Sequence, residues 1–228
     1  MSRKKDNFIP PSVATDVVIF TIIDDELNVL TVERTYGPEG WSLPGGFVGE
    51  KEDLEEAAQR TLFEKTGVKD VYLEQLYTFG DPKRDPRGRV ISIAYFALVS
   101  AEAVSAKNGK DTKGLKWQPL KKIPKLAFDH NEILSYATKR LVWKMEYTNV
   151  VYSLLPKYFS LTDLQKVYEI VLGRDIDKRN FRRKILSTGM IKATKMKEGG
   201  AHRPAIMYQF TDKDIRFISN PFGQFLKK

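Results

Sequence analysis

Hydrophobic and polar positions form two adjoining strand-like runs near the start of the chain. Residues 13–23 are mostly β-branched and apolar, and the acidic residues 24–26 separate them from residues 27–34, where apolar and polar side chains alternate. Two such runs on either side of a short polar turn are typical of a β-hairpin. The pattern therefore predicts that the first domain begins with two antiparallel strands.

A glycine- and proline-rich stretch and then a helical pattern follow this hairpin. We expect residues 37–46 to be irregular, because Pro38 and Pro44 cannot donate to a strand ladder. Residues 53–66 repeat apolar side chains at helical spacing, and Gly67 is expected to end that helix. Further strands are predicted at residues 71–80, 89–99 and 114–118, and a helix at 131–145. Strands with helices inserted between them indicate an α+β or sandwiched α/β/α domain.

The remainder of the chain is predicted to contain shorter elements. Helical patterns cover residues 147–155, 161–172 and 177–188, and Ser160 and Gly173 are expected to cap the middle one. Strand-like runs follow at residues 190–196 and 205–210. A helix, a helix–turn–helix and a two-stranded hairpin together make a winged helix-turn-helix domain.

Charge divides the chain at nearly the same place. Residues 1–149 carry 22 basic and 22 acidic side chains, whereas residues 150–228 carry 16 basic and 7 acidic ones, so the whole net charge of +9 lies in the last third. A solvated basic face would explain one cluster of cations, but so complete an asymmetry favours a polyanionic partner. We predict a disordered start at residues 1–10, a first domain at 11–148 and a basic winged helix at 149–228.

The composition excludes several classes of protein. The hydrophobic fraction of 42% is that of a globular protein, and no apolar run is long enough to span a membrane. The basic residues 1–8 have no apolar segment behind them, which argues against a secretory signal. Because the sequence has no cysteine, it can form neither a disulfide nor a thiolate metal site, and we expect the protein in the cytoplasm.

A spaced motif lies in the first domain. Seven residues fit the pattern G-x5-E-x7-R-E-U-x-E-E-x-G-U, in which U is aliphatic, namely Gly46, Glu52, Arg60, Leu62, Glu64, Gly67 and Val68. The sequence LPGGF at residues 43–47 leads into them. This pattern is the Nudix box, and over residues 46–68 the chain resembles the Nudix superfamily. The resemblance implies that the first domain has the Nudix fold, an α/β/α sandwich.

The box nevertheless departs from the pattern of the hydrolases. Nudix hydrolases bind Mg²⁺ through carboxylates on the box helix and direct water at a phosphoanhydride. Positions 61, 64 and 65 share one helix face, where three carboxylates would hold such an ion. Here they are Thr61, Glu64 and Lys65, and the Lys65 ammonium would repel a cation. Glu52 and Arg60 remain, but their family role includes a structural ion pair, so we predict neither a metal site nor a catalytic residue.

The chain as a whole resembles a narrower group, the Nudix-related transcriptional regulators of the NrtR family. The segments that carry this resemblance are RDPRGRVISIAYFAL (84–98), LAFDH (126–130), FSLTDLQKVYEIVLG (159–173), KRNFRRK (178–184) and HRPAIMY (202–208). The resemblance implies a homodimeric repressor of NAD metabolism genes, which binds double-stranded operator DNA and releases it when ADP-ribose or a related sugar occupies the Nudix domain.

Two other functions stay open at this point. An active Nudix hydrolase of ADP-ribose or nucleoside diphosphate sugars would need carboxylates from elsewhere, such as Asp81 or Asp85, and would have to tolerate Lys65. Relatives of the regulator group respond to pentoses including arabinose, so a pentose-responsive regulator of sugar catabolism is the other alternative.

Basic residues cluster on the predicted second helix of the helix–turn–helix, the element that enters the major groove in such motifs. Phe181 and Ile185 are expected to face the core, and the DNA-binding candidates of this helix are Lys178, Arg179, Asn180, Arg182 and Arg183. Arginine binds guanine edges or phosphates, and asparagine reads adenine. On the expected wing the candidates are Lys195, Lys197 and Arg203, with His202 beside them. A merely solvated basic surface is the alternative reading.

Candidate ligand-binding residues are spread over the first domain. We assign this role to Arg34, Trp41, Arg87, Tyr95, Phe128 and His130, which together offer charge for a diphosphate, aromatic faces for adenine and hydrogen bonds for ribose. Trp41 and Phe128 could equally fill the core, where large aromatic side chains usually lie. His130 could equally cap a helix. No cofactor and no metal are expected.

Overall fold

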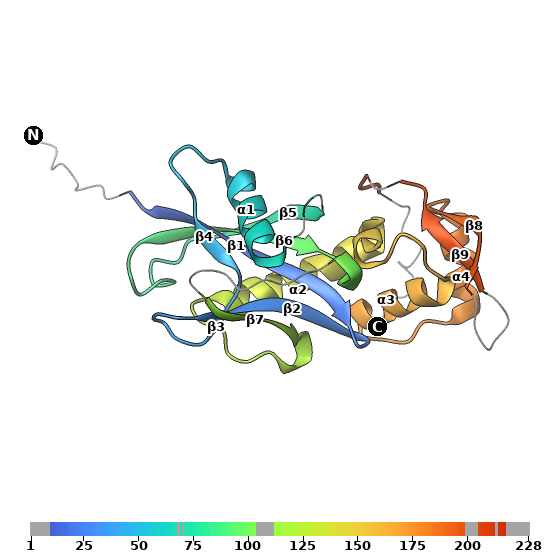
Figure 1. The fold of residues 1–228 in the computed structure, drawn as a ribbon, viewed down its shortest axis with the longest axis horizontal. Helices are drawn as coiled ribbons and strands as arrows, with labels where there is room; N and C mark the ends of the chain where they lie inside the picture. Colours follow the sequence, from blue (N-terminus) through green and yellow to red (C-terminus); the bar gives the residue numbers. More distant parts are fainter. Residues whose placement is uncertain are drawn as a thin grey trace, which may run out of the picture.

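The computed structural model describes residues 10–67, 69, 71–103, 112–198, 205–212 and 214–217. Residues 1–9 of the expected disordered start lie outside this part of the chain, and so do Val68, His202, Arg203 and the side chain of Lys197. Figure 1 shows the large sheet at one end of the molecule and a small hairpin at the other.

The first domain is built on a seven-stranded mixed sheet. Its strands are β1 (Ser12–Ile23), β2 (Glu26–Arg34), β3 (Trp41–Ser42), β4 (Gly45–Phe47), β5 (Tyr72–Phe79), β6 (Val90–Leu98) and β7 (Thr112–Pro119). The order β3-β2-β1-β6-β5 forms the main path, while β4 pairs with β1 and β7 pairs with β2. The predicted hairpin is confirmed, since β1 and β2 are antiparallel with Phe20 opposite Val29. The central strand β1 also runs parallel to β6.

Two helices cover the two faces of this sheet. Val17 and Ile19 of β1 belong to a core cluster with Ala58 and Leu62 of α1 (Leu54–Thr66). The alternating residues Val18 and Phe20 belong to the other cluster, with Ile133 and Leu141 of α2 (His130–Tyr147). Because successive strand side chains point to opposite faces, one buried strand supports both layers. The expected α/β/α sandwich is confirmed.

Helix α1 ends at Gly67 as predicted, and it begins one residue later than predicted, with Asp53 as its N-cap. The Asp53 side chain accepts a hydrogen bond from the backbone N–H of Glu56, whose own side chain accepts from the backbone N–H of Asp53. This capping box satisfies two N–H groups that have no partner inside the helix. Gly67 ends the helix in the left-handed region, with φ of 71°, a conformation that costs glycine little.

The stretch at residues 37–46 is more regular than expected. The short strand β3 lies within it and β4 begins in it, on either side of Leu43 and Pro44. Pro44 has no N–H to donate, but its carbonyl accepts a hydrogen bond of 2.8 Å from the Val17 N–H of β1. The expectation of a wholly irregular segment was therefore wrong, because β1 and β2 supply partners that the local sequence cannot show.

The second domain has the elements of a winged helix. They are α3 (Leu161–Leu172), α4 (Lys178–Ser187), β8 (Ile191–Glu198) and β9 (Ala205–Phe210), with β8 and β9 antiparallel. Ser160 and Gly173 cap α3 as predicted. Phe159 and Tyr208 exchange backbone hydrogen bonds of 3.1 and 2.7 Å, which join the segment before α3 to the hairpin.

The first of the three helices predicted for this domain, over residues 147–155, is not an α-helix. Residues 150–154 form only a 3-10 helix, η3 (Val150–Leu154), and α2 continues to Tyr147. Asn149 lies between the two, where its side chain donates to the carbonyl of Asp214 and accepts from the N–H of Arg216. The chain is therefore not helical between α2 and η3, where Asn149 bonds to a segment more than sixty residues away. The helical pattern of residues 147–155 did not predict these contacts.

The two domains share one continuous hydrophobic core. Val18 and Leu141 of the first domain and Leu164 and Phe181 of the second belong to the same cluster of buried residues. On the surface, Lys166 of α3 forms an ion pair of 2.5 Å with Asp25 at the β1–β2 turn. Two further 3-10 turns complete the fold, η1 (Ala101–Ala103) and η2 (Leu120–Lys122). In the part of the chain that the structure describes, no helix is long and apolar enough to cross a membrane.

Candidate functional site

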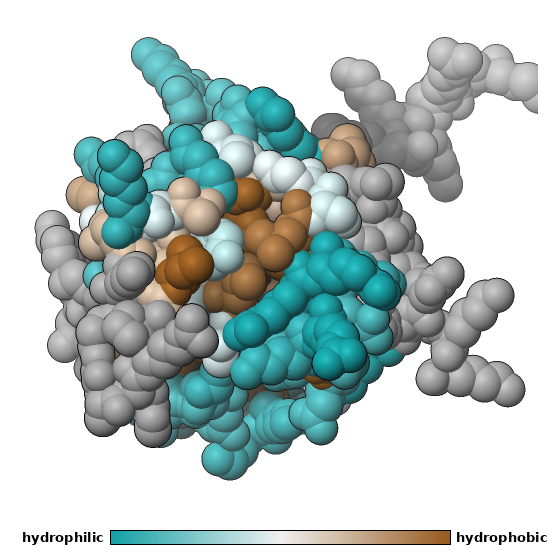
Figure 2. Space-filling model, turned by 90° about the vertical axis from the view of Figure 1, so that its right-hand side faces the viewer, coloured by the Kyte–Doolittle hydropathy of each residue, from teal (hydrophilic) through white to brown (hydrophobic). Residues whose placement is uncertain are grey.

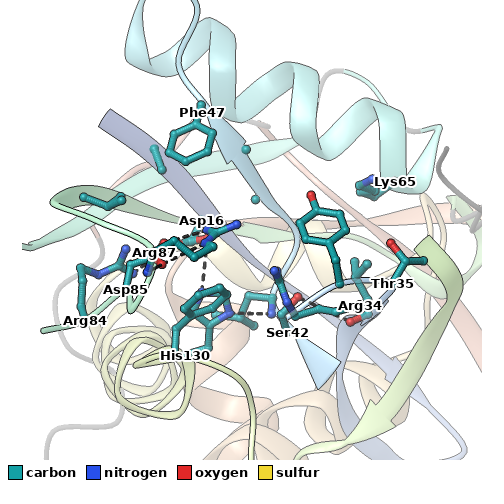
Figure 3. Close-up of a pocket in the computed structure, with 18 residues that line it drawn as sticks. Asp16, Arg34, Thr35, Ser42, Phe47, Lys65, Arg84, Asp85, Arg87 and His130 are labelled. Atoms are coloured by element: carbon teal, nitrogen blue, oxygen red, sulfur yellow. Dashed lines mark hydrogen bonds and ion pairs between the residues drawn. The ribbon is translucent and has the colours of Figure 1, made fainter. Parts of the chain in front are cut away.

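A cleft of about 180 Å³ opens between the sheet, α1 and the start of α2. Its lining residues come from β1, β2, the segment at 42–47, the end of α1, the loop at 84–87 and residues 128–130. Six charged side chains line it (Figure 3), with Arg34, Lys65, Arg84 and Arg87 as cations and Asp16 and Asp85 as anions. The cleft is therefore a net cationic site.

Four of the six predicted ligand-binding residues line this cleft, namely Arg34, Arg87, Phe128 and His130. The guanidinium carbons of Arg34 and Arg87 lie 4.7 and 5.1 Å from the centre of the Phe128 ring. Phe128 has a positive φ of 58°, which is rare for a side chain of this size. The ring thus contacts two guanidinium groups instead of lying in the core, and it lines the cleft.

Trp41 and Tyr95 are not among the lining residues. Tyr95 is 4% exposed and belongs to the cluster of Val17 and Leu62 under α1, where burial raises its pKa. Trp41 packs against the larger core cluster, and its carbonyl accepts a hydrogen bond of 2.8 Å from the Ala127 N–H. The structure therefore does not support a direct ligand contact for either side chain.

His130 is buried at the first position of α2. Its Nδ1 accepts a hydrogen bond of 2.9 Å from the Leu43 N–H, and its Nε2 lies 3.5 Å from Oδ1 of Asp16. Burial lowers the pKa of His130, so the ring is neutral near pH 7. The histidine therefore ties α2 to the floor of the cleft and does not cap the helix.

An ion-pair network that the sequence did not predict lies next to His130. The Arg84 guanidinium donates to both carboxylate oxygens of Asp129, at 2.8 and 2.7 Å, and to Asp16 at 3.2 Å. Asp16 also accepts a hydrogen bond of 2.6 Å from Ser92. Gly45 faces this carboxylate so closely that a Cβ there would lie 2.2 Å from Asp16 Oδ1. The segment 84–98 carries Arg84, but no local pattern shows that its partners are Asp16 and Asp129.

The carboxylates that an active hydrolase would have to recruit are otherwise engaged. Both oxygens of Asp85 accept from Arg87, at 2.9 and 2.7 Å, and this guanidinium lowers the pKa of Asp85. Asp81 is exposed and accepts from the Lys83 N–H. Among the described residues, no group of three histidines or acidic residues is placed to hold a metal ion.

The Nudix box keeps the ion pair between Glu52 and Arg60, which has a structural role. Arg60 donates to both oxygens of Glu52 at 2.7 and 2.9 Å, and Glu52 also accepts from the Gly49 N–H. These bonds lower the pKa of Glu52 to about 2 and hold the loop before α1. On the neighbouring face, Thr61 is buried, Glu64 lies 3.8 Å from Arg60, and Lys65 lines the cleft. This donor set does not fit Mg²⁺, which prefers several oxygen ligands.

Helix α4 presents basic residues to solvent at the opposite end of the molecule. Phe181 and Ile185 are fully buried as expected, and Asp177 caps the helix by accepting from the Asn180 N–H. The exposed members are Lys178, Arg179 and Arg183, and Lys195 is exposed on β8. Figure 2 shows hydrophilic side chains around a smaller apolar area on this end.

The other two candidates on α4 are partly engaged within the protein. Asn180 is half-buried, and its Oδ1 accepts a hydrogen bond of 2.8 Å from Arg183. Arg182 is half-buried, with Nε enclosed and without a hydrogen-bond partner in the described part of the chain. Among the α4 candidates, the arginines most open to an outside partner are therefore Arg179 and Arg183.

Comparisons with protein families match both parts of the chain. Residues 13–138 match the NUDIX domain, and residues 151–210 match the NrtR DNA-binding winged helix domain. The chain is 37% identical over 220 residues to the ADPR responsive transcriptional repressor NtrR of Acinetobacter baylyi, a match that covers 94% of this chain and 88% of that protein.

Solved structures agree in both sequence and fold. The crystal structure of Shewanella oneidensis NrtR complexed with a 27mer DNA has a TM-score of 0.77 at 37% identity, and the match covers 87% of this chain and 93% of that one. The NUDIX domain of the same NrtR complexed with ADP ribose has a TM-score of 0.53 at 39% identity, covering 60% of this chain and 93% of that one. The chain has a Nudix domain followed by an NrtR winged helix, and it is 37% identical to an NrtR-type repressor over 94% of its length. It therefore belongs to the NrtR family.

Proposed function

We propose that this protein is a transcription repressor of NAD metabolism genes, which binds operator DNA through residues 149–228 and ADP-ribose or a related sugar through residues 11–148. The effector releases the DNA. The observation that carries this proposal is the pairing, in one chain, of a cationic Nudix cleft that lacks the carboxylates for Mg²⁺ with a winged helix that holds all the excess positive charge.

The DNA-binding part of the proposal rests on α4. Its buried stripe leaves Arg179 and Arg183 exposed on a helix whose partner α3 packs behind it. Guanidinium groups suit both guanine edges and phosphates. The relative from Shewanella oneidensis was crystallised with DNA at 37% identity, which supports the same use of this domain here. Lys178, Asn180, Arg182, Lys195, Lys197 and Arg203 complete the proposed DNA-binding set.

The effector part rests on the cleft. Arg34 and Arg87 both contact the Phe128 ring, an arrangement that offers charge for phosphate beside a flat apolar surface for a base. A net cationic cleft favours a phosphorylated effector over an uncharged pentose such as arabinose. The Nudix domain of the Shewanella relative was solved with ADP ribose, and we assign the same class of ligand to this cleft.

The box supports binding rather than hydrolysis. A Nudix hydrolase activates water with a metal ion, but Thr61 is buried, Glu52 is held by Arg60, and Lys65 places an ammonium at the cleft. We therefore assign no catalytic residue to Gly46, Glu52, Arg60, Thr61, Glu64 or Lys65. The repressor needs no cofactor, and it acts in the cytoplasm as a homodimer, because symmetric half-sites on DNA call for two symmetry-related winged helices.

The proposal is tested with DNA that the protein itself selects from a random duplex library. The selected duplex is then bound to the protein, and ADP-ribose, AMP or arabinose is titrated in while fluorescence anisotropy follows the DNA. We expect ADP-ribose to lower the anisotropy and arabinose to leave it unchanged. Failure to select any duplex would refute the DNA-binding function, and release by arabinose alone would replace the effector with a pentose.

A further inference from the structure

Two of the four cations that line the cleft form no ion pair with an acidic residue among those that the structure describes. Arg84 is held by Asp16 and Asp129, and Arg87 is held by Asp85. By contrast, neither Arg34 nor Lys65 has a carboxylate oxygen within 4.0 Å in the described part of the chain. Among the described residues, the cleft therefore contains two positive charges that no carboxylate pairs directly, although Asp85 and Asp16 attract Arg34 at longer range.

Lys65 reaches the cleft from the last turn of α1, the helix that carries the box. It stands four residues after Thr61 and one after Glu64, on the face where the hydrolases place carboxylates. Figure 3 shows it on the side of the cleft away from Arg84, Asp85 and Arg87. The Lys65 ammonium therefore supplies positive charge on the side of the cleft where a divalent cation would supply it in a hydrolase.

Arg34 is held in place by contacts that involve no acid. Its Nε donates to the Pro38 carbonyl at 2.7 Å and its Nη2 to the Gly37 carbonyl at 3.1 Å. Its guanidinium also lies over the rings of Phe128 and Tyr36. Neutral partners position the charge without cancelling it, which is what a binding site for an anion requires.

We propose that Lys65 replaces the divalent cation of the hydrolases: its ammonium and the Arg34 guanidinium bind the diphosphate of the effector, which therefore binds without metal. This inference rests on the proposed function, because it assumes a nucleoside diphosphate sugar in the cleft. It adds that the box has been converted from a metal site into a phosphate-binding site, and it names the residue that does so.

The exchange also separates binding from hydrolysis. A metal ion lowers the pKa of its bound water and supplies a nucleophile at neutral pH. An ammonium attracts the same diphosphate but coordinates no water that it could activate. A sensor gains from this difference, because the effector stays intact for as long as it is bound.

The test is a calorimetric titration of ADP-ribose into the full-length protein in EDTA, repeated with Mg²⁺. We expect binding of the unmodified protein in EDTA, with an affinity that Mg²⁺ does not raise. Lys65→Met should weaken binding by about tenfold or more, since it removes a charge-assisted contact. Lys65→Arg should keep most of the affinity. Lys65→Glu should lose binding in EDTA and recover part of it in Mg²⁺, because it restores a carboxylate beside Glu64.

The matched control is Lys69→Met, which removes a charge four residues further on. Lys69 is exposed, its ammonium lies over Phe63, and it does not line the cleft. The affinity of the Lys69→Met variant for ADP-ribose should therefore equal that of the unmodified protein. Thermal unfolding of each variant shows that the fold is kept. Binding by the unmodified protein only in Mg²⁺, or equal affinity of Lys65→Met, would overturn the inference but not the proposed function. No binding of ADP-ribose under any condition would overturn both.

Discussion

The backbone N–H of Leu43 donates a hydrogen bond of 2.9 Å to Nδ1 of His130, across 87 positions of the chain. Leu43 lies beside the strands that floor the cleft, and His130 is the first residue of α2. Helix α2 then runs to Tyr147, and the winged helix begins within a few residues of its end. This one bond therefore links the cleft to the helix that leads into the second domain.

Ligand and DNA should oppose each other by the same factor. An effector releases DNA only if it binds the DNA-free arrangement more tightly, and linkage then requires DNA to weaken effector binding equally. A shift of α2 at His130 would change the spacing of two recognition helices in a dimer. We expect ADP-ribose to bind the protein–DNA complex more weakly than free protein in calorimetry. Equal affinities would mean that the Nudix domain is not the switch.

Acid should destabilise the protein through His130. Burial lowers the pKa of this histidine below its usual value of 6.5, so the unfolded chain takes up a proton where the folded protein does not. The free energy of unfolding therefore falls as the pH falls below about 6.5, until the folded pKa is reached. The charges around the ring are Asp16, Asp129, Arg84 and Arg34.

Thermal unfolding followed from pH 7.5 to 5.5 measures this effect. The variant His130→Gln keeps an acceptor for the Leu43 N–H but does not titrate, so its melting temperature should depend less on pH. The prediction is wrong if the unmodified protein and this variant lose stability in parallel over that range.

Removal of Arg84 should be costly. Arg84→Met leaves Asp16 and Asp129 without their shared cation in a site where the Arg84 side chain is only 4% exposed. An uncompensated buried charge destabilises a protein by about 3 kcal/mol or more. Urea unfolding should show this loss, whereas Lys121→Met, on the exposed turn η2, should unfold like the unmodified protein. A change below about 1 kcal/mol in Arg84→Met would contradict the inferred role of the network.

The exposed arginines of α4 should carry DNA affinity. Arg179→Ala and Arg183→Ala remove guanidinium groups that the protein does not bury, and each should weaken binding to the selected duplex on the order of tenfold. Affinity should also fall steeply with salt, because each neutralised phosphate releases counterions. Arg203→Ala, at a position between β8 and β9 in the sequence, should have a similar effect.

These DNA-binding variants need two controls. Lys121 lies on the first domain, so the Lys121→Ala variant should bind DNA like the unmodified protein. All of these variants should keep their affinity for ADP-ribose. If Arg179→Ala and Arg183→Ala both shift the duplex like the unmodified protein, then α4 is not the recognition helix.

Hydrolysis should be absent. We expect no release of AMP or ribose phosphate from ADP-ribose with Mg²⁺ or Mn²⁺, because Thr61 and Lys65 stand where two of the metal-binding carboxylates would lie. The double variant Thr61→Glu, Lys65→Glu should regain Mn²⁺ binding, measured by electron paramagnetic resonance. Metal-dependent turnover by the unmodified protein at the rates usual for enzymes would contradict the assignment of an inactive site.

Local sequence was enough for the elements whose signals lie within a few residues. The β1–β2 hairpin follows from two strand-like runs on either side of a polar turn, and α1 follows from its apolar stripe and Gly67. The buried positions Phe181 and Ile185 follow from helical spacing. The sequence also shows directly that Thr61 and Lys65 replace two glutamates of the Nudix box. A motif is defined by the spacing of its own residues, so no contact with a distant segment is needed to recognise it.

Tertiary structure decided which candidates meet in the cleft. Tyr95 and Phe128 are both aromatic residues in apolar segments, yet Tyr95 is buried under α1 while Phe128 lines the cleft beside two guanidinium groups. Arg84 and Asp16 pair across 68 positions. Periodicity tells which side of an element faces inward, but it cannot tell which distant segment packs there. The short strands β3 and β4 and the break at Asn149 depend on such partners too, because their hydrogen bonds are completed by residues far away in the chain.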